Sequence, residues 1–287
     1  MRTIRSGSVA FCCGTWRTPG SFISATSLEI KQRRIAAGRG LRWIAEAFRL
    51  FRRGPLIWLL LNTLLLVIGS ALMLIPLLGP VIFALLTPVF MAGLIVACRD
   101  TEGGKPVTLA HLFVGFRRNA AQLVTVGGVY LAGQLIVGGV MLFLGGDELR
   151  AVAAAAMQQS VGTEPVPAPG DKVYFALLVG AALFTPLAMA VWFAPPLVIL
   201  RGAAPFAAMK ASIRGCLDNL LPMLVYGAGL VGLLLGVLFV LRTVLAILPA
   251  GAGFLREVAA IGTFLTWVTL CLISVYTGYR EVFSDET

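Results

Sequence analysis

Residues 55–98 read PLIWLLLNTLLLVIGSALMLIPLLGPVIFALLTPVFMAGLIVAC, and this stretch contains no charged residue. A helix of about 20 apolar residues crosses the hydrocarbon core of a bilayer, so the stretch is long enough for two spans. Gly79-Pro80 divides it, because proline fits the first turn of a helix and disrupts a helix interior. The stretch therefore predicts a tight hairpin of two membrane-spanning helices, residues 55–78 and 81–98.

Four further apolar runs follow, at residues 121–144, 173–200, 220–241 and 258–279. The second of these contains Pro186, Pro195 and Pro196, which predict a kinked or tilted helix. Of the whole chain, 59% is hydrophobic and only 13% is charged, whereas about a quarter of a soluble domain is charged. These observations exclude a disordered chain and predict an all-α, polytopic integral membrane protein with six transmembrane helices.

The positive charge is distributed unevenly about these spans. If the amino terminus is cytoplasmic, 19 of the 23 Lys and Arg residues lie on the cytoplasmic side, and only Arg150, Lys172, Arg242 and Arg256 lie outside. Because basic residues stay on the cytoplasmic side, we expect both termini in the cytoplasm of a bacterium, with the protein in the inner membrane. The net charge of +10 thus orients the chain, and we expect no nucleic-acid partner.

The remaining segments complete the predicted domain organisation. Residues 1–37 are polar and basic and predict a disordered cytoplasmic tail; an alternative is that the natural protein begins at residue 28. Residues 38–283 form a single six-helix membrane domain, and residues 145–172 form its long periplasmic loop. The loop begins with a stretch of helical composition and ends in the extended sequence TEPVPAPGDK.

A charged helical pattern precedes the first span. Apolar and charged residues alternate at helical spacing in GRGLRWIAEAFRLFRRGP, with Leu41, Ile44, Phe48 and Phe51 on one face. This pattern predicts an amphipathic helix in the membrane interface, with Trp43 near the boundary between membrane and water.

The same pattern recurs twice, in LAHLFVGFRRN (residues 109–119) and APFAAMKASIRGCLDNL (residues 204–220). Gly54, Asn119 and Asn219 align, and two of the inward helices share a step, Thr87-Pro88 and Thr185-Pro186. The pattern predicts a threefold repeat of one amphipathic interfacial helix and two transmembrane helices, over about residues 38–100, 106–202 and 204–283.

Several of these segments resemble a known family. RRIAAGRGLRWIAEAFRLFRRGPLIW, LLTPVFMAGLIVACRD, PLAMAVWFAPPLVIL, AAMKASIRGCLDNLLPMLVYG and ISVYTGYREVF are together similar to an uncharacterised family of six-span bacterial inner-membrane proteins, over about residues 31–283. More remotely, the interfacial-helix pattern is similar to the membrane-anchoring domain of some glycerophosphodiesterases. The resemblance implies location and fold, and it carries no catalytic or cofactor-binding residue to this chain.

The candidate site consists of basic residues on the interfacial helices. We expect contacts to anionic lipid headgroups from Arg42, Arg49, Arg52, Arg53, Arg117, Arg118, Lys210 and Arg214. The simpler alternative is that these residues only fix topology and anchor the helices, as basic residues do in most membrane proteins.

The sequence gives little evidence for catalysis, for metal or cofactor binding, or for a polar pore. The five cysteines lack CxxC spacing and His111 is the single histidine, so we expect no metal, no cofactor and no catalytic residue. The polar residues at bilayer depth are few and uncharged, and Asn62 and Gln134 more often bridge helices than line a pore.

Two functions remain from this reasoning. The first is a non-enzymatic membrane component that organises lipid or a partner protein; the second is a transporter or permeation pathway for a small or lipid-like molecule. Ala228, Gly232 and Gly236, spaced by four residues, indicate close packing either within one helix bundle, which we favour, or between copies in a homo-oligomer.

Overall fold

A computed structural model describes residues 30–159, 168–246 and 253–283 of the chain. Every regular element in these ranges is a helix. Six stretches are long and apolar enough to cross a membrane, which confirms the predicted all-α class and the count of six spans. They are α2 (Pro55–Met73), α3 (Leu78–Glu102), α5 (Ala120–Gln159), α6 (Asp171–Trp192) continued by α7 (Ala194–Arg201), α9 (Leu220–Ala246) and α10 (Gly253–Phe283).

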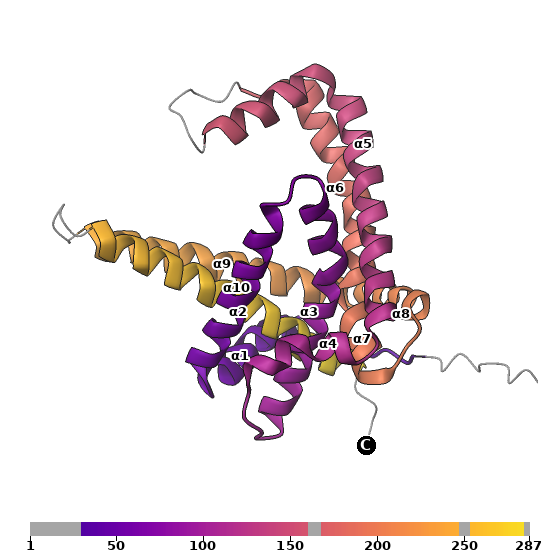
Figure 1. Cartoon of the computed structure of the whole chain (residues 1–287), viewed down its shortest axis with the longest axis vertical. Coiled ribbons are helices and arrows are strands. Elements are labelled where there is room, and N and C mark those ends of the chain that lie inside the picture. Colours follow the sequence, from indigo (N-terminus) through magenta and orange to yellow (C-terminus); the bar gives the residue numbers. More distant parts are fainter. Residues whose placement is uncertain (1–29, 160–167, 247–252, 284–287) are drawn as a thin grey trace, which may run out of the picture.

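The six spans form three hairpins that leave a common base in different directions (Figure 1). The α5–α6 hairpin stands upright in this view, the α9–α10 hairpin runs across it, and the α2–α3 hairpin lies between them. The base contains the shorter helices α1 (Arg39–Arg52), η1 (Leu109–Phe113), α4 (Val114–Arg117) and α8 (Pro205–Asp218). Away from the base the helices therefore diverge instead of forming one closed bundle. Lipid tails are as apolar as leucine, so the hydrophobic effect does not draw apolar helix faces together there.

The core lies in the base, where the ends of α3 and α10 meet α1 and α7. Trp43, Trp58 and Phe193 are among its largest fully buried side chains. The sequence placed Trp43 near the membrane boundary, but the structure buries it between α1, α9 and α10. Its ring packs at 5.5 Å from that of Tyr226, and its indole nitrogen donates to Glu281.

The first hairpin turns slightly earlier than predicted. Helix α2 ends at Met73 and α3 begins at Leu78, so Gly79 and Pro80 form the first turn of α3 instead of the connection. Gly79 packs against the backbone of Leu72, where a Cβ would lie 1.8 Å from the carbonyl oxygen. The absence of a side chain at residue 79 thus lets the two helices meet closely at the turn.

The fourth span breaks where its prolines predict. Helix α6 ends at Trp192, and Pro195 and Pro196 occupy the first turn of α7. Ser212 of α8 stabilises the break: its hydroxyl accepts a hydrogen bond from the Phe193 backbone N–H (2.9 Å) and donates to the Met189 carbonyl (2.5 Å).

The long loop is partly helical. Gly146, with φ +55°, introduces a kink in α5, and the helix then continues to Gln159, as the composition of this stretch predicts. The Glu148 carboxylate accepts a hydrogen bond from the Gly170 backbone N–H (2.7 Å), which joins the two ends of the loop. Residues 160–167, which include most of TEPVPAPG, lie outside the described residues.

The first described residues, 30–37, pack against the base. Residues 30–37 contain no helix, and they lie along the ends of α8 and α10. The Arg33 N–H bonds the Val282 carbonyl (2.9 Å), and the Asn219 amide bonds both the Ile35 N–H (2.8 Å) and the Arg33 carbonyl (2.9 Å). Both described ends of the chain therefore lie side by side. The remainder of the predicted tail, residues 1–29, lies outside the described residues.

Gly232 and Gly236 of α9 do not pack against any described residue. A Cβ built on Gly232 or Gly236 meets no atom within 4 Å. The favoured interpretation of these glycines as internal packing positions is therefore wrong. The hairpins diverge, so this part of α9 has no neighbouring helix from another hairpin against it.

Candidate functional site

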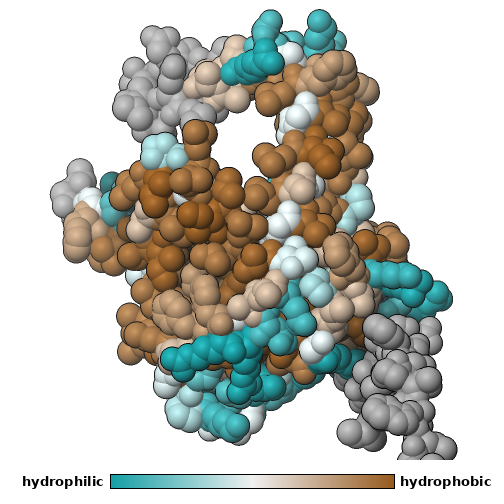
Figure 2. Space-filling model, turned by 45° about the vertical axis from the view of Figure 1, so that its right-hand side comes forward, coloured by the Kyte–Doolittle hydropathy of each residue, from teal (hydrophilic) through white to brown (hydrophobic). Residues whose placement is uncertain are grey.

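The eight predicted basic residues are exposed at the base. Hydrophilic side chains form a band along the lower end of the molecule, below a largely hydrophobic body (Figure 2). Arg42, Arg49, Arg52 and Arg53 belong to α1 and its end, Arg117 and Arg118 to the end of α4, and Lys210 and Arg214 to α8.

These residues divide into two groups by their partners. Arg49 pairs with Glu46, Arg52 lies over the ring of Phe48 at 5.9 Å, and Arg53 bonds backbone carbonyls. The other five form no ion pair or hydrogen bond with any described residue, and we call them the unpaired basic set: Arg42, Arg117, Arg118, Lys210 and Arg214.

Exposed apolar residues accompany the basic ones on each of the three segments. Leu41 and Phe48 of α1 are about half exposed, and Phe206 of α8 is 68% exposed. Large apolar residues of η1 and α4 are exposed in the same way, namely Leu109, Phe113 and Phe116. The residues that instead pack α1 onto the body are Trp43, Ala47 and Leu50. Each segment therefore presents both apolar and basic side chains at the molecular surface.

An apolar groove of about 920 Å³ lies between α1, α9 and α10. Leu41, Ile44 and Phe48 form its α1 wall, and Trp267 with Thr263 supplies part of the α10 wall. The lining is almost entirely apolar. A path for a small polar molecule needs polar walls. If the protein transports a molecule, this groove therefore suits a lipid-like molecule and not a small polar one.

The acidic residues at the base are engaged in a polar network. Arg280 of α10 forms ion pairs with Glu46 of α1 and Glu102 of α3. The Tyr276 hydroxyl donates to Glu102 at 2.6 Å. Glu102 thus joins two spans, α3 and α10, that are far apart in the chain.

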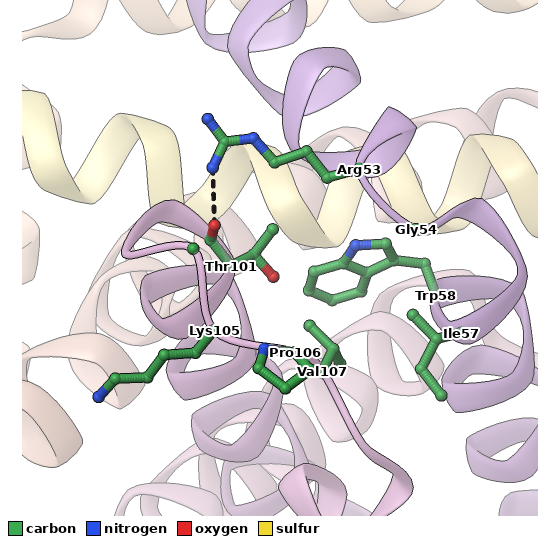
Figure 3. A pocket seen from close by; sticks show the side chains of 9 residues that line it. Arg53, Gly54, Ile57, Trp58, Thr101, Lys105, Pro106 and Val107 are labelled. Atoms are coloured by element: carbon green, nitrogen blue, oxygen red, sulfur yellow. Dashed lines mark hydrogen bonds between the residues drawn. The ribbon is translucent and has the colours of Figure 1, made fainter.

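A small pocket lies where α1, α2 and α3 meet (Figure 3). This junction pocket has a volume of about 260 Å³ and is lined by Arg53, Gly54, Ile57, Trp58, Thr101, Gly104, Lys105, Pro106 and Val107. Arg53 donates from Nη1 to the Thr101 carbonyl at 2.7 Å and to the Glu102 carbonyl at 3.3 Å, at the end of α3. Among the predicted lipid contacts, Arg53 is thus the one that also holds helices together.

Sequence reasoning missed two residues of this pocket. Trp58 is 2% exposed, and its buried indole N–H has no hydrogen-bond partner among the described residues. Lys105 lies in the turn after α3, beside Gly104, whose φ is +75°. A lysine in the glycine-rich turn between the α3 span and η1 could have drawn attention to Lys105. Nothing in the apolar run PLIWLLL distinguishes Trp58 from a core residue.

Comparison with known proteins identifies the family. The chain is 32% identical over 253 residues to a protein of Burkholderia thailandensis named "probable inner membrane protein", and the match covers 87% of this chain and 92% of that protein. The chain belongs to the same family of inner-membrane proteins. No family model and no solved structure matches it. The comparisons thus show a multi-pass inner-membrane protein, and the similarity to glycerophosphodiesterase anchoring domains is not among their findings.

The described part of this inner-membrane protein offers few groups for chemistry. It contains no cluster of three side chains that could hold a metal ion. His111 pairs with Asp100 at 3.3 Å, and its other ring nitrogen lies within 3.1 Å of Thr108. Burial raises the pKa of the Cys216 thiol to about 12, against the opposing effect of a hydrogen bond with Ser212. Cys216 is therefore protonated at neutral pH and is a poor nucleophile.

Proposed function

We propose that this inner-membrane protein is a non-enzymatic membrane component whose basic end binds anionic lipid headgroups at the cytoplasmic face. One observation carries the proposal: the unpaired basic set lies beside exposed apolar residues on three separate segments of the base. A basic side chain near an anionic membrane surface contributes about 1 kcal/mol, so five such residues acting together favour anionic lipid by several kcal/mol.

The groove gives the bound lipid a second contact. Phe48 lines the apolar groove, and the guanidinium of Arg52 lies over its ring in a cation–π contact. A cation therefore lies next to an apolar wall, an arrangement that suits a lipid with its acyl chain along α1 and its headgroup at Arg52. A partner protein that docks on the same basic end is the alternative form of this proposal.

The proposed threefold repeat explains why three such segments exist. Gly54, Asn119 and Asn219 align in the sequence. The backbone carbonyl of each accepts a hydrogen bond from the backbone N–H four residues later. Both Thr-Pro steps also agree, since Thr87 and Thr185 each donate to a carbonyl four residues earlier (2.7 and 2.8 Å). The backbone at the three aligned positions differs, with φ of −171° at Gly54, +56° at Asn119 and −121° at Asn219, so the proposed repeat rests on the sequence pattern and on the recurring order of an interfacial segment followed by a hairpin.

The lipid preference is expected to depend on charge at the basic end. Changing Arg117 and Arg118 together to glutamine removes about 2 kcal/mol of attraction and should lower retention of phosphatidylglycerol roughly 10- to 30-fold. Native mass spectrometry, with phosphatidylcholine as the neutral competitor, measures this ratio. The control changes Arg150 and Lys172 to glutamine, which removes the same charge from the opposite end and should leave the ratio unchanged. Equal retention of both lipids by the wild type would contradict the proposal.

The proposed orientation has its own test. A periplasmic alkaline phosphatase inserted between Thr163 and Gly170 should be active in cells, because we place this loop outside the inner membrane. The same reporter inserted after Gly103, in the turn at the base, should be inactive. The reverse pattern would put the basic end in the periplasm and overturn the orientation.

A further inference from the structure

We propose that the junction pocket is a binding site for a phosphate group, provided by a lipid headgroup or by free phosphate. The inference rests on the proposed lipid function and deepens it by naming the chemical group that the base recognises. Three independent features of the pocket point to an anion with several acceptor oxygens.

The first feature is positive charge from two separate segments. Arg53 follows α1, and Lys105 lies in the turn after α3, yet both line the junction pocket. Arg53 uses only Nη1 for its two carbonyl contacts, so its other donors remain for a ligand. Phosphate accepts such charge-assisted hydrogen bonds well.

The second feature is the indole N–H of Trp58. A buried donor without a partner is costly, so such donors are rare in folded proteins. In Figure 3 the nitrogen lies on the ring edge that faces Arg53, while the six-membered ring points toward Thr101 and Pro106. The nitrogen itself is fully covered, so a small movement of the ring toward Arg53 would bring this donor to an acceptor oxygen bound beneath the Arg53 side chain.

The third feature is the start of α2. Its N-cap is Gly54, no side chain caps it, and Pro55 occupies the first turn. Gly54 and Ile57 both line the junction pocket, so the uncapped end of this 19-residue helix borders the space. Unpaired N–H groups and the positive end of the helix dipole favour an anion there.

The negative groups nearby are already compensated. The carbonyls at the end of α3 accept the Arg53 hydrogen bonds, and Glu102 is bound to Arg280 and Tyr276. Asp100 forms an ion pair with Arg99 (3.6 Å). The volume of about 260 Å³ is also several times the roughly 30 Å³ share of one water molecule, so the pocket has room for a phosphate.

The test follows the five tryptophan indole N–H signals of the full-length, ¹⁵N-labelled protein in a neutral detergent. Inorganic phosphate is added against chloride at constant ionic strength, and short-chain phosphatidylglycerol is added in a parallel series. We expect a saturable shift of the Trp58 signal, which is assigned by its absence in Trp58→Phe. Trp267 is the internal control for inorganic phosphate, because its indole nitrogen is also buried and unpartnered but lines the apolar groove.

Each outcome decides the inference. A Trp58 shift with both probes, or with phosphatidylglycerol alone, supports a lipid-headgroup site; a shift with inorganic phosphate alone supports a site for free phosphate. No shift with either probe overturns the inference, even if the anionic-lipid preference of the base persists. A saturable Trp58 shift without that preference would instead sink the proposed function and leave the phosphate site standing.

A second variant keeps the test independent of Trp58. Lys105→Gln changes an exposed side chain and should weaken phosphate binding about tenfold, equivalent to about 1.4 kcal/mol. Lys172→Gln, with the same change at the opposite end of the molecule, should bind phosphate like the wild type. Equal affinity of both variants and the wild type would show that the phosphate does not lie in the junction pocket.

Discussion

Replacing Trp43 by alanine is expected to lower the free energy of unfolding by about 3–5 kcal/mol, as for other fully buried large side chains. The Trp43 ring is 1% exposed and lies between Tyr226 and Gly278, so its loss leaves a cavity where α1, α9 and α10 meet. The loss also frees the carboxylate of Glu281 from one of its donors. Thermal unfolding in detergent should show a melting temperature lower by about 10 °C.

Two further variants distinguish the loss of the buried ring from the loss of its hydrogen bond and from a change elsewhere on α1. Trp43→Phe retains most of the ring and removes the hydrogen bond to Glu281, so it should lose less than the alanine variant; such a bond contributes about 1.5–3 kcal/mol. Phe48→Ala on the same helix removes a half-exposed ring and should change the melting temperature little. A Trp43→Ala protein as stable as the wild type would show that α1 is not anchored through this residue.

Replacing Gly93 by valine is expected to separate α3 from η1. A Cβ at residue 93 would lie 2.4 Å from the His111 carbonyl oxygen and 2.8 Å from that of Leu112. These are backbone atoms, so no side-chain rotation can relieve the contact, and overpacking of this kind costs about 1–3 kcal/mol. We therefore expect a melting temperature lower by roughly 5 °C or more, together with reduced anionic-lipid retention because the η1 and α4 segment shifts.

The matched control is Gly138→Val in α5. A Cβ there meets nothing within 4 Å, and valine has a higher helix propensity than glycine. The Gly138 variant should therefore unfold within a degree or two of the wild type and retain lipid normally. Equal effects of the two substitutions would show that loss of glycine, and not the close approach of α3 to η1, is responsible.

The sequence predicted the helical elements well, because each signal is local. Hydropathy alone located the six spans, and Pro195 with Pro196 located the break before α7. The hairpin turn was misplaced by a few residues. Gly79-Pro80 is typical both of a connection and of a first helical turn, and only the contact of Gly79 with Leu72 distinguishes these two roles.

The candidate site was predicted only in part. All eight basic residues are exposed, since charge alone keeps such side chains out of an apolar environment. Arg49 and Arg52 find their partners three and four residues away on α1, whereas Arg53 bonds carbonyls at the end of α3, 48 and 49 residues away in the chain. The junction pocket combines residues up to 54 positions apart, Arg53 and Val107, and no spacing in the sequence announces it.

By itself, the sequence determined that this chain is an all-helical, six-span membrane protein with most of its positive charge on one side of the spans, because helix length, hydropathy and charge asymmetry are properties of short segments. Only the tertiary structure decided which groups meet. It joined Glu102 to Arg280, buried Trp43 in the base and left the Trp58 N–H without a partner among the described residues, in a pocket that Arg53 and Lys105 also line. Away from the base lipid replaces protein as the neighbour of each helix, so apolar sequence specifies a span there without specifying its partner.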